Sequence, residues 1–96
     1  MMTIEIIKDK VMEMLEDLCN EKITDTATQL QSDLHMNSLQ LVMMVVMIEE
    51  VFNIELDESD MNPFALINVQ DIIKLVEKYK LKSEVKENSE INLPPL

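Results

Sequence analysis

The chain has 96 residues, of which 47% are apolar and only 3% aromatic, with nine Met, no Trp and no Gly. A chain of this length forms one domain with a small core, and its composition favours a bundle of helices over a turn-rich sheet. The formal net charge is −11, and no Lys or Arg lies between Ile23 and Ile73, which argues against nucleic acid as a partner and indicates proteins with basic patches.

The first predicted element is a one-faced amphipathic helix from Thr3 to about Cys19. Its apolar residues recur at helical spacing, and those expected to point inward are Ile4, Ile7, Val11, Met14, Leu15 and Leu18. Cys19 is the only cysteine, so no internal disulfide can form. Its neighbours are acidic, which disfavours a nucleophilic thiolate, so we expect Cys19 to be a small, buried or half-buried side chain that fills space beside the core. With no leader pattern at the N-terminus and no apolar run long enough to span a membrane, we expect a cytoplasmic protein without a membrane partner.

A long polar connection follows from Asn20 to Asn37. Four apolar residues are available to pin this connection to the bundle, namely Ile23, Ala27, Leu30 and Leu34. At its end Asn37 and Ser38 are both good N-caps for the next helix. A serine at this boundary lies beside the positive end of the helix dipole, where backbone donors favour a phosphate or another anion.

The second helix is predicted from about Ser38 to Phe52. Its inward stripe consists of Leu41, Met44, Val45, Ile48, Val51 and Phe52. The complementary positions are also apolar, so this helix is either buried on several sides or has a face reserved for partners.

The chain after the second helix contains the signals of a short turn or helix and then of a long last helix. Asn53 to Met61 is acidic and without periodicity, and Asn62-Pro63 reads as an N-cap and first residue of a short turn or helix. Asn68 with Asp71 predicts the cap of a last helix that is complete by about Leu81. Its inward residues are expected to be Val69, Ile72, Ile73, Val76 and Tyr79. The predicted organisation is one domain over residues 1–81 and a disordered tail over residues 82–96.

Three consecutive segments resemble the acyl carrier and peptidyl carrier protein family. They are the stretch Asp33-Leu34-His35-Met36-Asn37-Ser38-Leu39, the apolar helix after it, and the run from Glu49-Glu50 through Phe52 and Ile54 to Leu56. The resemblance covers about Ile4 to Tyr79. It implies an all-α, four-helix bundle with three long helices, a short third helix and a long loop between the first two. It also implies that Ser38 carries a covalent 4′-phosphopantetheine from coenzyme A, and that the protein is a carrier and not an enzyme.

The same resemblance predicts the partners. These are a phosphopantetheinyl transferase and acyl- or aminoacyl-loading and processing enzymes with basic or apolar docking patches, acting on a monomer. The partner-recognition residues are expected to be Asn37, Leu39, Gln40, Met43, Val46, Glu49 and Glu50. Where fatty-acid carriers usually have acids, this chain has Asn37, Gln40 and Met43, which favours a specialised polyketide, nonribosomal peptide or lipid pathway.

Three alternatives have a basis in the residues. The first alternative is a hydrolase that uses Asp33, His35 and Ser38. These residues lie too close together in the sequence, and the chain has no Gly for the strained turn of a nucleophile elbow. We therefore expect no catalytic residues. An unmodified helical adaptor of the same fold would act through protein contacts alone. The acidic residues of 55–60 do not match a calcium loop, so no metal site is expected, although added Mg²⁺ or salt should relieve their repulsion.

Overall fold

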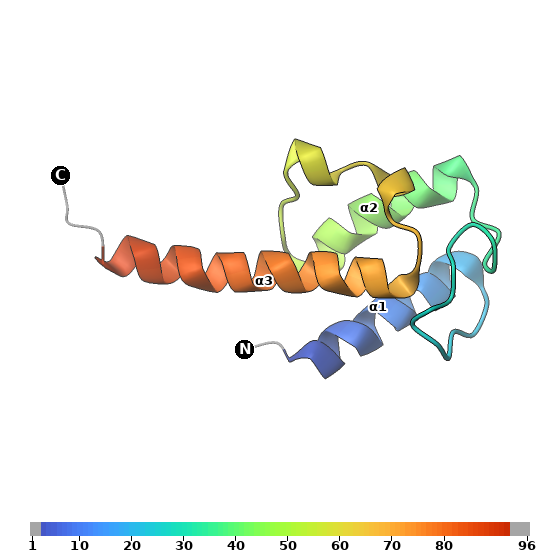
Figure 1. Ribbon diagram of the computed structural model, residues 1–96, viewed down its shortest axis with the longest axis horizontal. Helices are drawn as coiled ribbons and strands as arrows, with labels where there is room; N and C mark the ends of the chain where they lie inside the picture. The colour runs from blue at the N-terminus through green and yellow to red at the C-terminus, as the bar shows by residue number, and fades with distance from the viewer. Residues whose placement is uncertain (1–2, 93–96) are drawn as a thin grey trace.

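The computed structural model describes the backbone of residues 3–92 and the side chains of residues 3–81. In this part of the chain the order of elements is α1 (Ile4–Cys19), α2 (Ser38–Phe52), the 3-10 turns η1 (Glu58–Asp60) and η2 (Pro63–Ala65), and α3 (Val69–Asn92). α1 packs against both α2 and α3, and η2 packs beside α2 (Figure 1). The predicted all-α class is confirmed, with two short turns in place of the expected third helix.

Side-chain caps start α1 and α3, and the sequence predicted the cap of α3. Thr3 Oγ1 accepts the N–H of Ile6 at the start of α1. At the start of α3, Asn68 Oδ1 accepts the N–H of Asp71 at 2.9 Å, and Asp71 Oδ2 accepts the N–H of Asn68 at 3.3 Å. This reciprocal pair satisfies donors that a helix leaves unpaired in its first turn, so the predicted cap is confirmed.

α1 and α2 end in the same way. Asn20 and Asn53 follow the last helical residues with φ of 56° and 52°, and their N–H groups donate to the carbonyls of Glu16 and Glu49. The carboxylates of the same two glutamates each accept, at 3.0 Å, the N–H seven residues further along the chain. Asparagine tolerates left-handed backbone better than most residues, so it ends these helices in a chain that has no glycine.

The core lies between the three long helices and also receives residues from the connections. Helix residues buried there include Val11 and Leu15 of α1, Leu41 and Ile48 of α2, and Val76 of α3. The connections contribute Ile23, Leu30, Leu34, Met36 and Leu56. Burial of Met36 was not predicted from the sequence.

Three residues expected to point inward are exposed instead. Ile4 stands in the first turn of α1 and is 49% exposed, Val51 is 40% exposed, and Ala27 lies on the outside of the long connection. Val51 lies about 70° around α2 from the line through Leu41 and Ile48, so it reaches only the edge of the buried arc. The predicted stripes were therefore slightly too wide.

Backbone hydrogen bonds fasten the connection between α1 and α2 to the start of α3. The N–H of Leu30 donates to the carbonyl of Ile67 at 2.9 Å, and the N–H of Val69 donates to the carbonyl of Thr28 at 3.1 Å. These bonds flank an isolated antiparallel bridge between Gln29 and Asn68. The connection between α1 and α2 is long but ordered, because its backbone forms hydrogen bonds with the end of the connection between α2 and α3.

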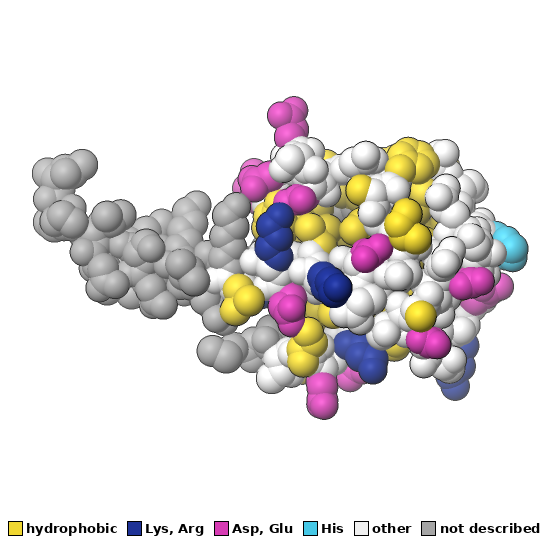
Figure 2. All heavy atoms as spheres, viewed as in Figure 1, with side chains coloured by type: hydrophobic (Ala, Val, Ile, Leu, Met, Phe, Trp, Pro, Cys, Tyr) yellow, Lys and Arg dark blue, Asp and Glu magenta, His cyan; other side chains and the backbone are white. Residues whose placement is uncertain are grey.

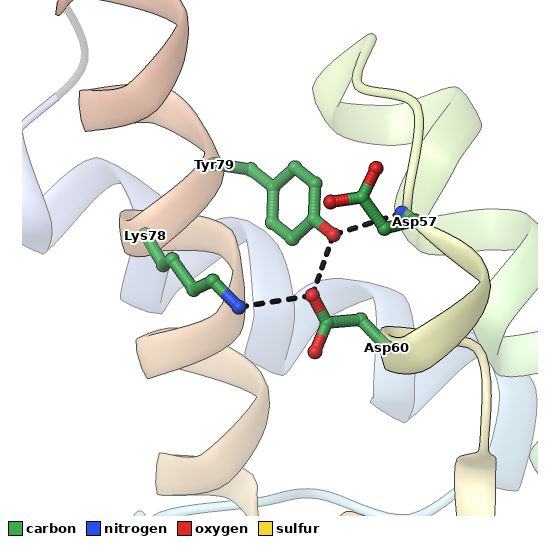
Figure 3. Close-up of polar contacts among 4 residues, drawn as sticks. All are labelled: Asp57, Asp60, Lys78 and Tyr79. Carbon is green, nitrogen blue, oxygen red and sulfur yellow. Dashed lines mark hydrogen bonds and ion pairs between the residues drawn. The ribbon is translucent and has the colours of Figure 1, made fainter.

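A polar tether fastens η1 to α3 (Figure 3). The Tyr79 hydroxyl donates to Asp60 Oδ2 at 2.6 Å and accepts the N–H of Asp57 at 2.8 Å. Lys78 Nζ lies 2.9 Å from the same oxygen of Asp60. η1 has no buried residue of its own, so these contacts from α3 supply much of what holds it in place.

The backbone of α3 continues to Asn92, past the end expected near Leu81. Side chains of 82–92 and all of 93–96 lie outside the described residues, so the division into a domain over 1–81 and a disordered tail over 82–96 stays a prediction. None of the helices in the described chain combines the length and the apolar character that crossing a membrane requires.

Candidate functional site

Ser38 is the first residue of α2, and its side chain is exposed. The capping role that the sequence allowed for either residue belongs to Asn37, whose Oδ1 accepts the N–H of Gln40 at 2.8 Å. The Gln40 side chain closes the capping box by accepting the N–H of Asn37 at 3.0 Å. Among the described residues the Ser38 hydroxyl has no hydrogen-bond partner, so it is available for chemistry.

The start of α2 retains donors for an anion. The capping box uses the N–H of Gln40, and the N–H of Leu41 donates to the carbonyl of Asn37 at 3.0 Å. The N–H groups of Ser38 and Leu39 have no partner within the described chain, and the first turn contains no acid. A phosphodiester on Ser38 would therefore meet two open donors and the positive end of the helix dipole, with no carboxylate of this turn to repel it.

His35 and Asp33 do not complete a hydrolase arrangement with Ser38. Asp33 Oδ2 accepts the N–H of Gln29 at 2.8 Å, so this carboxylate holds the connection together. His35 is exposed with φ of 55°, a left-handed conformation in which glycine is usual and histidine is tolerated. That backbone leaves His35 as a loop residue.

The outer face of α2 is apolar. Leu39, Met43, Val46 and Glu50 follow one another at helical spacing and are all exposed, with Leu39 at 68%. Val42 is half exposed beside them and was not named as a recognition residue. Four of the predicted partner-recognition residues thus lie on one continuous face.

The other predicted recognition residues have structural tasks as well. Asn37 and Gln40 cap each other at the start of α2. Glu49 is half-buried and accepts the N–H of Leu56 at 3.0 Å, so its carboxylate is partly committed to the connection after the helix. Glu50 is the carboxylate of this pair that is presented to solvent.

Cys19 and the acidic connection supply no chemistry to this site. Cys19 is half-buried against the core, as predicted, and burial, followed by the nearby charge of Glu21, raises the pKa of its thiol. Among the residues whose positions are given, no group of three or more His, Cys, Asp or Glu is arranged to hold a metal ion.

The all-α bundle with an exposed serine and open backbone donors at the start of its second helix is compatible with a helical carrier protein. The family model described as a phosphopantetheine attachment site matches residues 9–76. Two proteins of Brachyspira hyodysenteriae named acyl carrier protein, one of them from strain WA1, are each 35% identical over 80 residues, which is 83% of this chain and 99% of theirs. The chain therefore belongs to the acyl carrier, phosphopantetheine-binding family.

Membership in this family establishes two of the predictions. Its members are carriers and not enzymes, and their prosthetic group is a covalently attached 4′-phosphopantetheine. The residues at the start of α2 fit that group, because an exposed hydroxyl stands beside two open N–H donors.

Proposed function

We propose that this protein is an acyl carrier protein that holds acyl or aminoacyl intermediates on a 4′-phosphopantetheine arm at Ser38. The observation that carries the proposal is the position of Ser38, an exposed hydroxyl without a partner in the described chain at the first residue of α2. Asn37 performs the capping, so esterification of Ser38 removes no hydrogen bond that the helix needs.

Attachment of the arm exchanges a phosphoanhydride bond of coenzyme A for a phosphodiester on Ser38. A new bond forms between Ser38 Oγ and the phosphorus that bears pantetheine in coenzyme A, the pyrophosphate bond breaks, and 3′,5′-adenosine bisphosphate leaves. The hydroxyl proton passes to a base of the transferase, which also supplies Mg²⁺. When bound, the arm supplies a terminal thiol that carries the cargo as a thioester.

The chain's own residues orient the attachment point. The capping box of Asn37 and Gln40 fixes the first turn of α2, and the N–H groups of Ser38 and Leu39 remain open to an anion beside Ser38. The buried residues Leu41 and Met44 hold the helix against the bundle from its first turns onward. The serine is thus presented on a rigid element and not on a mobile loop.

We infer a specialised pathway of the polyketide, nonribosomal peptide or lipid type. The support is the first turn of α2, which lacks acids, followed by a face with Leu39, Met43 and Val46 exposed. Partners that recognise such a face do so mainly by apolar contact, since charge pairs are possible only further along the helix at Glu49 and Glu50. We also propose that the protein is a monomer in the cytoplasm, since a net charge of −11 disfavours self-association.

The attachment site is tested by intact mass. The apo protein is incubated with coenzyme A, Mg²⁺ and a broad-specificity phosphopantetheinyl transferase, alongside Ser38→Ala and the matched control Ser59→Ala, which changes another exposed serine. We expect wild type and Ser59→Ala to gain the mass of one phosphopantetheine and Ser38→Ala to gain none. If several transferases add no mass to the folded wild-type chain, the unmodified adaptor is the correct function.

The pathway is tested by restoring acids. Asn37→Asp, Gln40→Glu and Met43→Glu together preserve the capping box and create the acidic start that fatty-acid carriers have. We expect a generic fatty-acid synthase set to acylate the wild-type holo protein slowly and this variant faster. Acylation of the wild type at the rate seen with that set's own carrier would refute the specialised role.

A further inference from the structure

A groove lies between α1 and α2, on a flank of α2 that the proposed attachment of the arm does not use. It has a volume of about 130 Å³, and its lining consists of Lys10, Glu13, Met14, Asp17, Met47 and Val51. Met14 is buried and closes the groove toward the core, whereas Met47 is half-buried and Val51 is 40% exposed. Packing of the two helices therefore leaves apolar side chains open in what we call the α1–α2 groove.

This groove is separate from the outer face of α2. Val51 directly follows Glu50 in the helix, so it lies about 100° further around the axis. At the rise of an α-helix, Met47 and Val51 are about 14 and 20 Å along the axis from Ser38. An occupant of the groove therefore leaves both Ser38 and the face that carries Leu39 uncovered.

The volume of the groove decides which kind of ligand fits. Sites for cofactors and metabolites usually enclose roughly 300 to 1,000 Å³. A volume of about 130 Å³ has room for one long side chain but not for such a molecule. The groove therefore suits a single side chain that protrudes from another protein.

Two carboxylates on α1 border the apolar part of the groove. Glu13 and Asp17 are exposed, and their spacing along α1 makes them neighbours on the helix surface. Lys and acidic side chains are interspersed over the face of the molecule that Figure 2 shows, and Asp60 pairs there with Lys78. Glu13 and Asp17 form no ion pair within the described chain, and Lys10 stands about 10 Å along α1 from Asp17. The two acids are thus available to a cation from outside.

Arginine fits this combination of shape and charge. Its planar guanidinium offers donors in a fixed fork that matches carboxylates, and its methylene stem packs on apolar side chains. A Lys ammonium is a compact, strongly hydrated charge without that fork, and an aromatic ring brings no charge for the two acids. Repulsion from Lys10 directs the guanidinium toward Glu13 and Asp17. Arg is also enriched among the residues that contribute most of the binding energy at protein interfaces.

We infer that the α1–α2 groove anchors one arginine of a partner protein. The guanidinium lies between the carboxylates of Glu13 and Asp17, and the stem covers Met47 and Val51. This partner holds the carrier and leaves the arm accessible to enzymes. A second copy of this chain cannot supply the anchor, since the sequence contains no Arg. Occupation of the groove does not depend on modification of Ser38, so the site goes beyond the proposed function.

The test uses the full, isotope-labelled chain and two short peptides with blocked ends. One is Gly-Leu-Arg-Leu-Gly, and the other has citrulline in place of Arg, which keeps the planar end of the side chain and lacks its charge. Binding is followed by two-dimensional NMR. We expect the Arg peptide to shift the amide signals of Glu13, Asp17, Met47 and Val51 in a saturable way, with an affinity about fivefold above that of the citrulline peptide.

Matched variants separate the groove from the general negative charge of the chain. Glu13→Gln and Asp17→Asn should each weaken binding of the Arg peptide about threefold to fivefold, the upper range for an exposed ion pair. Glu5→Gln is the control, because it removes the same charge from an exposed residue about 12 Å along α1 from Glu13. We expect Glu5→Gln to bind like the wild type.

A second pair of variants tests the apolar side of the groove. Val51→Ser should weaken binding about threefold, since it removes contact with the arginine stem. Val42→Ser is the control, because Val42 is also about half exposed but lies about 180° around α2 from Val51. Circular dichroism establishes that each variant is folded.

Three outcomes would overturn the inference. These are equal affinity for the two peptides, equal losses in Glu13→Gln and Glu5→Gln, and shifts confined to the acidic residues Glu50, Glu55 and Glu58. Intact mass after transferase treatment reports on Ser38 independently. Failure of the wild type to load would contradict the proposed function, whereas normal loading without discrimination between the peptides would contradict the groove alone.

Discussion

α1 and α2 have almost the same length and the same inward packing, but their outer faces differ. α1 presents charged residues such as Glu5, Lys8 and Asp9 to solvent, whereas α2 presents Leu39, Met43 and Val46. A bundle needs only one apolar face from each helix, so α1 has the surface that packing alone requires. The apolar outer face of α2 has no role in this packing, and it lies beside the serine that we propose carries the arm.

The connections that follow these two helices differ in a related way. Four buried side chains, Ile23, Leu30, Leu34 and Met36, fix the connection after α1. The connection after α2 buries Leu56, but η1 and η2 have no buried residue, and a polar tether from Tyr79 holds η1. Polar contacts with α3 therefore matter more for the connection after α2 than for the connection after α1.

The largest expected effect tests whether the inner faces are equivalent. Leu15→Ala in α1 and Leu41→Ala in α2 each empty a fully buried site and should each lower the free energy of unfolding by about 2 to 5 kcal/mol. Urea denaturation followed by circular dichroism measures both. A loss near zero in either variant would show that the two helices do not share one core.

The next largest effect concerns the tether. Burial, followed by the hydrogen bond to Asp60, raises the pKa of Tyr79 to about 12. Its folded pKa lies above the unfolded value near 10, so the stabilisation is complete below pH 10 and is lost as the pH rises toward 12.

Denaturation at several pH values should therefore give a steeper decline for wild type than for Tyr79→Phe above pH 10. The comparison with Tyr79→Phe removes the contribution of lysines, which titrate in the same range. Parallel curves for the two proteins would mean that Tyr79 does not hold η1.

A smaller effect tests the two matching helix ends. Glu16→Ala and Glu49→Ala each remove a carboxylate that accepts a backbone N–H at 3.0 Å. Each should lower the free energy of unfolding by about 1 to 2 kcal/mol, because a part-buried donor loses its charged partner. Glu50→Ala is the control, since that exposed residue makes no such bond in the described chain, and a loss as large as that of Glu49→Ala would rule out this role.

The smallest effect on stability is expected at the outer faces. Met43→Gln in α2 and Glu13→Gln in α1 should both change the melting temperature little, by the equivalent of about 0.5 kcal/mol or less. Only Met43→Gln should raise the KM of a transferase or loading enzyme for the protein. An unchanged KM in Met43→Gln, or a similar rise in Glu13→Gln, would show that partners do not recognise the outer face of α2.

Much of the fold could be predicted because its signals are local. Periodicity and caps gave α2 its observed limits at Ser38 and Phe52, and the pair of Asn68 and Asp71 marked the start of α3. The third element was harder to predict, since Asn62-Pro63 starts either a helix or a short turn and only its packing beside α2 distinguishes the two. For the same reason the sequence could not decide whether Asn37 or Ser38 caps α2.

By itself the sequence determined the helical class, the limits of α2 and the serine at its start, since each depends on neighbours within a few residues. Tertiary structure alone decided that Met36 is buried, which glutamate turns back to the chain, and how Tyr79 reaches Asp60 across 19 residues. Such pairings depend on where distant segments meet. A local sequence pattern cannot predict these contacts, because they depend on how all three helices pack together.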